Sequence, residues 1–150
     1  MVPGRYILII ALVTFTVLIS GCLESGNGSG GINSVTVMNG THFIAAAPEI
    51  HEGASVVFNV VSDGPVNLII MDRDNYTKFF AAGQGGPVQW SACAIAINVT
   101  GGSLRFAAPY SGNYTFIVDN SQLVEGSKVG ISPITFSANY TYSWSNDPKL

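Results

Sequence analysis

The chain has 150 residues, of which 47% are hydrophobic and 10% charged, and its formal net charge is −3. This length allows one domain with a short appendage. The six Lys and Arg residues are spread singly, which argues against a nucleic-acid partner. Two cysteines are too few for a disulfide scaffold or a cysteine-based zinc site.

Residues 1–21 have the layout of a signal peptide. One cation, Arg5, precedes an uncharged apolar run over residues 7–19. Such a run falls within the ~7–15 residues of a signal-peptide core and is shorter than the ~20 residues of a membrane-spanning helix. The small residues Ser20 and Gly21 then precede Cys22.

This order of charge, apolar run, two small residues and cysteine resembles the lipobox of prokaryotic lipoproteins. The resemblance implies cleavage before Cys22, acylation of its thiol and anchoring in the cell membrane. A plain signal peptide, or an uncleaved anchor with an incidental Cys22, is the alternative. Each of these interpretations places the rest of the chain outside the cytoplasm.

A Gly/Ser-rich segment follows over residues 22–31 and is interpreted as a flexible tether, although a disordered domain terminus has the same composition. The folded domain is then expected over residues 32–150. The chain also carries six Asn-x-Ser/Thr sequons, about three times the number expected by chance. They predict a glycosylated surface protein, whereas simple enrichment of polar residues on a weakly charged chain is the alternative. The sequons begin at Asn27, Asn39, Asn75, Asn98, Asn113 and Asn139.

Short β-branched and aromatic runs, separated by Gly, Pro and Asp turn signals, predict an all-β domain without helices. The clearest strand covers residues 136–144, where apolar and polar residues alternate. About eight antiparallel strands in this length indicate a two-sheet β-sandwich or jelly roll. The expected strands are 33–38, 41–46, 54–61, 66–71, 88–99, 103–107, 113–119 and 129–144.

Alternation also assigns faces within these strands. In the segment 93–99 it points Cys93, Ile95 and Ile97 inward, so that Cys93 is expected to be a small buried hydrophobe and not a nucleophile. Asn98 falls on the polar parity of this segment, as Asn113 and Asn139 do in theirs. A glycan on such an asparagine would not enter the core.

The segment 106–120 contains a Pro, a Gly and a Tyr-x-Phe-x-x-Asp-Asn pattern. It resembles the strand pair of GOLD-like sandwiches, the lumenal domains of p24 cargo proteins. The segment 66–79 is similar to a pattern in membrane-tethered archaeal sandwich proteins. These patches imply a fold and a non-enzymatic recognition or structural module. They do not imply cargo sorting, because the coiled coil and transmembrane tail of p24 proteins are missing from this sequence.

Catalytic and metal-binding patterns are scarce. His42 and His51 are nine residues apart, and Glu49 and Glu52 flank the second, so a surface metal site there is the weaker alternative to a solvated loop. The serines form no nucleophile-elbow motif, and no phosphate loop or dinucleotide fingerprint occurs. We therefore expect no enzyme activity and no cofactor.

The corner Asp72-Arg73-Asp74-Asn75 offers oxygens at alternating positions, as a calcium loop does. It lacks the Gly at loop position six and the Glu at position twelve, where Thr77 and Gly83 stand. We expect a capping turn and treat Asp72, Asp74 and Asn75 as weak metal candidates only.

Two functions remain open. The first is a lipid-anchored, extracytoplasmic β-sandwich that acts as a structural or protein-interaction module at the cell surface. The second is a module that binds a glycan or solute through exposed aromatic rings. A third function, that of a hydrolase, is disfavoured because the sequence shows no catalytic set. The burial of five aromatic side chains would discriminate between the first two functions: Tyr76, Trp90, Tyr140, Tyr142 and Trp144. Tyr140, Tyr142 and Trp144 are expected to be buried in the core.

Overall fold

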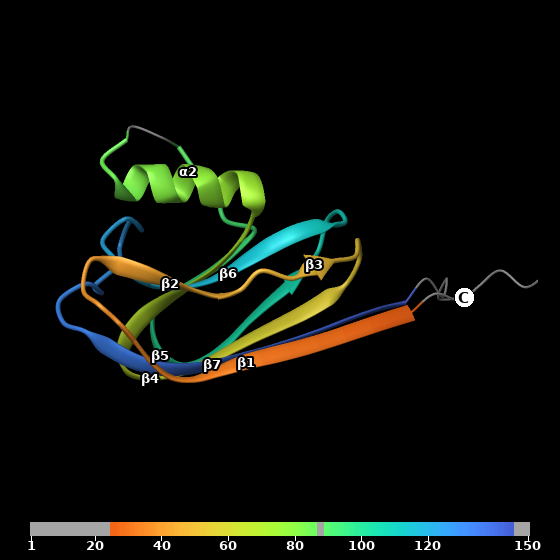
Figure 1. Ribbon diagram of the computed structural model, residues 1–150, viewed down its shortest axis with the longest axis horizontal. Coiled ribbons are helices and arrows are strands. Elements are labelled where there is room, and N and C mark those ends of the chain that lie inside the picture. The colour runs from red at the N-terminus through yellow and green to blue at the C-terminus, as the bar shows by residue number, and fades with distance from the viewer. Residues whose placement is uncertain (1–24, 87–88, 146–150) are drawn as a thin grey trace, which may run out of the picture. The chain divides into compact units, whose positions relative to one another are not determined.

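The computed structural model describes residues 25–86 and 89–145, and the signal segment and Cys22 lie outside these residues. One compact unit runs from Gly26 to Trp144. The described residues form seven strands and one helix, which are labelled in Figure 1. They are β1 (Ser25–Val37), β2 (Thr41–Ala46), β3 (Glu49–Ile50), β4 (Ser55–Asp72), α2 (Arg73–Gly83), β5 (Ala94–Ala107), β6 (Gly112–Asn120) and β7 (Ile134–Ser145).

The strands form a two-layer antiparallel sandwich, so the predicted all-β fold class is confirmed. Their order is β1-β7-β4-β6-β2, with β3 paired to β6 and β5 paired to β4. One layer contains β1, β7, the first half of β4 and the second half of β5 (Figure 1). The other contains β2, β3, β6, the second half of β4 and the first half of β5. The first strand of the domain therefore pairs with the last.

β4 belongs to both layers. Residues 55–62 pair with β7, and residues 67–72 pair with β6. Its ladder with β5 is irregular between Val61 and Val66, where Gly101 stands opposite Val61. The turn signals at 62–65 and 100–102 were expected to separate strands, but each lies inside one long strand and marks the bend between layers. Polar residues stabilise this bend through hydrogen bonds: Ser62 Oγ donates to Gly64 O, and Asp63 accepts from Thr135 N.

The main core fills the space between the layers. Alternation over 113–119 predicted its β6 contribution correctly, because Tyr114, Phe116 and Val118 are fully buried there. Phe58 from β4 contacts Phe116 with ring centroids 5.3 Å apart. Phe136 on β7 is 1% exposed. The residues with both faces buried, 66–71, lie at the centre of the second layer.

The helix α2 is a feature that the sequence patterns did not predict. Asp72 forms its N-cap by accepting from the backbone N–H of Asn75 at 2.8 Å. Only Phe79 of this helix is buried, and it packs on a second small core with Ile69, Met71 and Ile117. A helix with one buried residue has no apolar stripe, which explains why periodicity missed it.

The assignment of faces over residues 93–99, at the start of β5, was wrong at Ile95 and Ile97, whereas Cys93 and Val99 do pack against the main core. Ile95 and Ile97 are each 41% exposed, whereas Ala94 and Ala96 pack against the main core. Ile95 stands opposite Ile69, on the same side of the sheet as α2. The small residues face inward here because the neighbouring core positions hold larger side chains.

The Gly/Ser-rich segment differs from the expected tether. Residues 25–31 belong to β1, which pairs with β7, so the strand part of the domain begins seven residues before the expected boundary at Ile32. Among the described residues, no helix is long and apolar enough to cross a membrane.

Candidate functional site

One end of the sandwich gathers the aromatic residues of β7. The indole of Trp144 stacks on the imidazole of His51 with ring centroids 4.0 Å apart and an interplanar angle of 11°. The rings of Tyr142 and Tyr140, next along the same face of β7, are parallel to each other with centroids 6.5 Å apart. Tyr140 also contacts the ring of Phe116 edge-on. A pocket of about 260 Å³ opens beside Trp144, lined by Asn27, Glu49, Ile50, His51, Ser111 and Tyr142.

Glycines of β1 make room for these rings. A Cβ atom at Gly26 would lie 2.6 Å from Trp144 Nε1, and one at Gly28 would lie 2.5 Å from the phenol oxygen of Tyr142. At Gly30 it would lie 2.7 Å from the ring of Tyr140. Three alternate glycines therefore receive three alternate aromatic rings, and we call this arrangement the glycine–aromatic ladder.

The predicted burial of Tyr140, Tyr142 and Trp144 holds in part. All three pack against the main core, but each is only half-buried. Their faces contact other parts of the protein, and the face of Trp144 that stacks on His51 is not open to a sugar. Of the other two aromatic candidates, Tyr76 is part of α2, and Trp90 packs beside this helix and meets Phe79 edge-on.

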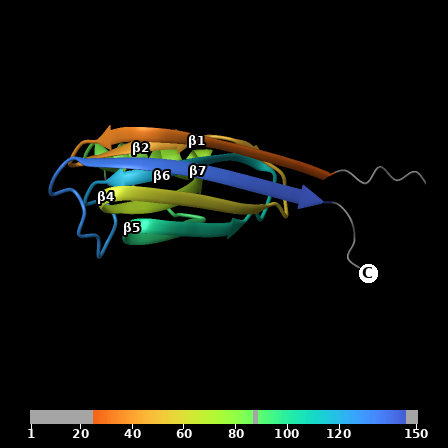
Figure 2. The same ribbon diagram turned by 90° about the horizontal axis from the view of Figure 1, so that it is seen from below.

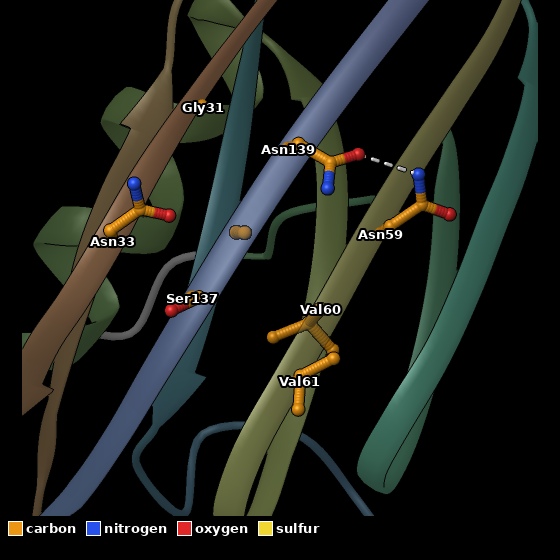
Figure 3. A pocket seen from close by; sticks show the side chains of 8 residues that line it. Gly31, Asn33, Asn59, Val60, Val61, Ser137 and Asn139 are labelled. Carbon is orange, nitrogen blue, oxygen red and sulfur yellow. Dashed lines mark hydrogen bonds between the residues drawn. The ribbon is translucent and has the colours of Figure 1, made fainter.

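The outer face of the first layer is polar and uncharged over most of its width. Figure 3 shows Asn33, Ser137, Asn139 and Asn59 around a shallow pocket of about 230 Å³. Asn59 Nδ2 donates to Asn139 Oδ1 at 2.7 Å, and Ser103 Oγ donates to Asn59 Oδ1. The amide groups on this face therefore bond to one another across the strands.

The Asp72 corner is built as a helix cap. Its carboxylate accepts from the backbone N–H and side-chain amide of Asn75, and from the hydroxyl of Tyr110 at 2.6 Å. Burial would raise the pKa of Asp72, but the hydrogen bonds from Tyr110 and Asn75 outweigh it and hold the pKa below its ordinary value. The same hydrogen bond raises the pKa of Tyr110. Asn75 Oδ1 in turn accepts from Ser91 N, so the corner fastens the segment after α2.

These oxygens are directed at protein donors. Of the weak metal candidates, Asp72 and Asn75 share the cap, while Asp74 is exposed in the first turn of the helix. Within the described part of the chain, no three His, Cys, Asp or Glu side chains lie close enough together to hold a metal ion.

A buried carboxylate on β6 was not predicted as a structural centre. Asp119 is fully buried and accepts from Asn67 Nδ2 at 2.8 Å, from Ser121 Oγ at 2.6 Å and from Ser121 N. Burial raises the pKa of Asp119, and the hydrogen bonds from Ser121 and Asn67 counter this rise. Its neighbour Asn120 binds Gly130 N and Ser132 O, so the two residues fasten the loop 121–133 to the sheet.

The two histidines lie in different places. His42 stands opposite Asp119 across the β2–β6 ladder, and its Nε2 lies 3.3 Å from the hydroxyl of Tyr76. Burial lowers the pKa of His42, and the charge of Asp119 acts in the opposite direction. His51 stacks on Trp144 instead. Cys93 is half-buried, and burial raises the pKa of its thiol.

The sequon asparagines fall into two groups. Asn27, Asn39, Asn113 and Asn139 are exposed. The side chains of Asn75 and Asn98 are half-buried and used in hydrogen bonds, Asn98 Oδ1 accepting from Lys128 N at 2.6 Å. The geometry thus leaves four sequons open to a modifying enzyme and engages two in the fold.

Comparison with known proteins gives likenesses to several solved structures. No family model and no curated protein matches the chain. It is similar to a periplasmic inhibitor of g-type lysozyme from Aeromonas hydrophila, with 14% identity, a TM-score of 0.43, and coverage of 83% of this chain and 90% of that one. It is also similar to a protein of the disulfide-linked pili of Bacillus endospore appendages, with 14% identity, a TM-score of 0.43, and coverage of 81% and 90%.

Proposed function

We propose that the chain is a membrane-anchored, extracytoplasmic β-sandwich lipoprotein that serves as a structural or protein-interaction module and not as an enzyme. The observation that carries this proposal is that the buried and capping polar groups of the domain form hydrogen bonds within the protein. Asp72, Asp119 and Asn120 cap a helix or fasten a loop, and their hydrogen-bonding atoms are directed at protein partners. Such groups stabilise a fold and leave little that could act on a substrate.

The anchor is Cys22, and the start of β1 supports a close attachment. Only two residues, Leu23 and Glu24, stand between Cys22 and the first residue of β1. A lipid on Cys22 would hold the domain against the membrane surface without a long tether.

The GOLD-like resemblance belongs to the same proposal. Its segment 106–120 forms the end of β5 and the whole of β6. The three inward residues of its Tyr-x-Phe pattern build the core, and Asp119 and Asn120 clamp the following loop. These are structural roles, which suit a module used for recognition or support.

The experiment that tests the anchor is the Cys22→Ala variant of the full chain. We expect the variant to leave the membrane fraction or to accumulate as a larger, unprocessed precursor. Cys93→Ala is the matched control, because it removes the other cysteine and should leave the distribution unchanged. Unchanged size and membrane binding of Cys22→Ala would contradict the lipoprotein assignment.

A second candidate is a glycan- or solute-binding module, favoured by the pocket beside Trp144. An indole with Asn27, Glu49 and Ser111 around it offers an apolar surface and polar groups for sugar hydroxyls. Retention on immobilised glycans tests it. Loss of retention in Glu49→Gln with unchanged stability would favour this candidate, and no retention of the parent protein on any glycan would remove it.

A further inference from the structure

The two margins of the first layer are built differently. Figure 2 shows β1 along one margin of this layer and β5 along the other. The β5 margin of this layer carries Arg105 and is bent by Gly102 at φ 151°. Asn98, at φ 58°, lies in the part of β5 that belongs to the second layer, where it bonds to the loop 126–128. Charges, bends and covering loops are the usual means by which a sheet margin avoids pairing with another strand.

β1 has none of these features over its first part. It is 13 residues long, contains no charged residue and no proline, and pairs with β7 alone among the described strands. Its first irregular residue is Ser34 at φ 52°, so residues 26–33 are a regular strand. We call these residues the free edge. An edge of this length exposes backbone N–H and C=O groups that a further strand can bond.

The glycine–aromatic ladder adds an apolar component beside the free edge. The phenol oxygens of Tyr140 and Tyr142 reach the positions of Cβ atoms at Gly30 and Gly28, so the ring tips lie over β1 itself. These rings are half-buried, and a strand added outside β1 would cover their remaining exposed parts.

We propose that the free edge pairs antiparallel with the free edge of a second copy of this chain, joining the two first layers into one continuous sheet. Such a dimer has a two-fold axis through the β1–β1 ladder. The inference deepens the protein-interaction part of the proposed function by naming the partner, and it does not depend on the lipid.

Charge and shape favour a second copy as the occupant. The chain has a net charge of −3, yet the free edge is uncharged, so two copies meet there without like charges side by side. A strand with large inward side chains would meet the ring tips above β1. The second copy presents Gly26, Gly28 and Gly30 on that face with its own ring tips above them, so the ring tips of the two copies would meet over the paired β1 strands.

A matched pair of lysine variants tests the proposal. Ser29 and Thr141 are exposed neighbours on the same face, since Gly28 and Gly30 stand opposite Tyr142 and Tyr140. Ser29→Lys places a charge on the free edge, and Thr141→Lys places the same charge one strand inward. We expect sedimentation equilibrium of the full chain in density-matched detergent to give a dimer for the parent protein and for Thr141→Lys, and a monomer for Ser29→Lys. Circular dichroism and urea midpoints should show that both variants fold.

Three outcomes would overturn the proposal: a parent protein that stays monomeric at high micromolar concentration, a dimer that survives Ser29→Lys, or a dimer that both lysines abolish equally. A monomeric parent would mean that the edge pairs with another protein or with none. The Cys22→Ala chain should dimerise as the parent does. Its release from the membrane is therefore a separate result, and failure of the lipid anchor cannot be confused with failure of the edge pairing.

Single cysteines placed along the edge determine the geometry. In an antiparallel pair, a residue on the two-fold axis lies next to its own copy. Each step of two residues away from the axis adds about 13 Å to the separation. Oxidation of Asn27→Cys, Ser29→Cys and Asn33→Cys chains in membranes, each in a Cys93→Ala background, should therefore give disulfide yields that fall with distance from the two-fold axis. Equal yields at all three positions, or a dimer with Thr141→Cys, would contradict antiparallel edge pairing.

Discussion

The glycine–aromatic ladder and the face beneath α2 are held together by different means. In the ladder, rings from β7 occupy space that glycines of β1 leave open, and no charged group takes part. On the sheet face that α2 covers, the buried carboxylate of Asp119, the helix cap Asp72 and the half-buried His42 are each held by a directed hydrogen bond to a different partner. The first region should therefore respond to changes of shape and hardly to pH, whereas the second should respond to both charge and pH.

The largest effect is expected from Asp119→Ala. The change leaves Asn67 Nδ2, Ser121 N and Ser121 Oγ without their buried acceptor, and each such loss costs about 1–3 kcal/mol. The free energy of unfolding, measured by urea titration, should fall by about 3 kcal/mol. Asp63→Ala is the control, because this exposed carboxylate accepts from Thr135 N and should contribute less than about 1 kcal/mol. Equal losses would show that the buried network does not stabilise its region.

Gly28→Val tests the ladder by shape alone. The added side chain would displace Tyr142, and overpacking of this kind costs about 1–3 kcal/mol. We expect the lower part of that range, since Tyr142 is half-buried and its ring tip can move. In a Tyr142→Ala background the same change should cost almost nothing, because the clash is gone. If Gly28→Val lowered the free energy of unfolding equally in that background, the cause would be a change in β1 itself and not a clash with the Tyr142 ring.

Asp72→Ala should lower the free energy of unfolding by about 1 kcal/mol, the contribution of an N-cap. The carboxylate acts here as a hydrogen-bond acceptor for protein groups, so thermal melts of the parent protein in millimolar Ca²⁺ and in chelator should coincide. A Ca²⁺-dependent rise in Tm that Asp72→Ala abolishes would instead show a metal site at this corner.

The smallest effect is a pH dependence from His42. Burial lowers its pKa in the folded state, so the unfolded chain binds the proton more tightly. Stability from this residue is present above the ordinary histidine pKa of about 6.5 and is lost as the pH falls through and below that value. The urea midpoint should therefore drop less between pH 7.5 and 5.5 in His42→Gln than in the parent protein. Equal drops would remove His42 as the cause, and Gly28→Val should not alter this slope.

Much of the sandwich could be predicted because its strands carry their own pattern. The β6 residues Tyr114, Phe116 and Val118 stand at alternate positions and face the main core as expected. The joined strands could not be predicted, since Ser62–Pro65 has turn chemistry whether it ends a strand or bends one. The faces of Ile95 and Ile97 were wrong because residue size within β5 does not reveal which layer its neighbours fill.

The features of the candidate site were harder to predict because their signals lie far apart in the chain. The glycines at 26, 28 and 30 have the composition of a coil, and only their spacing matches the aromatic residues at 140, 142 and 144. Asp72 was recognised as a capping residue, but the helix behind it has a single buried residue and showed no period. For Asp119 the sequence held no sign of burial, since an aspartate at the end of a strand is usually solvated.

The pairing of β1 with β7 also sets the order in which the domain can form. Among the described strands, β1 is synthesised first and its one partner, β7, is synthesised last. The first half of β4 likewise waits for residues 136–143 to complete its ladder. Local turns cannot close either contact, so the first layer assembles only when nearly the whole chain is present, and folding is expected to be slow compared with a helical protein of this size. A nascent chain of this topology cannot complete its first layer until β7 has been synthesised.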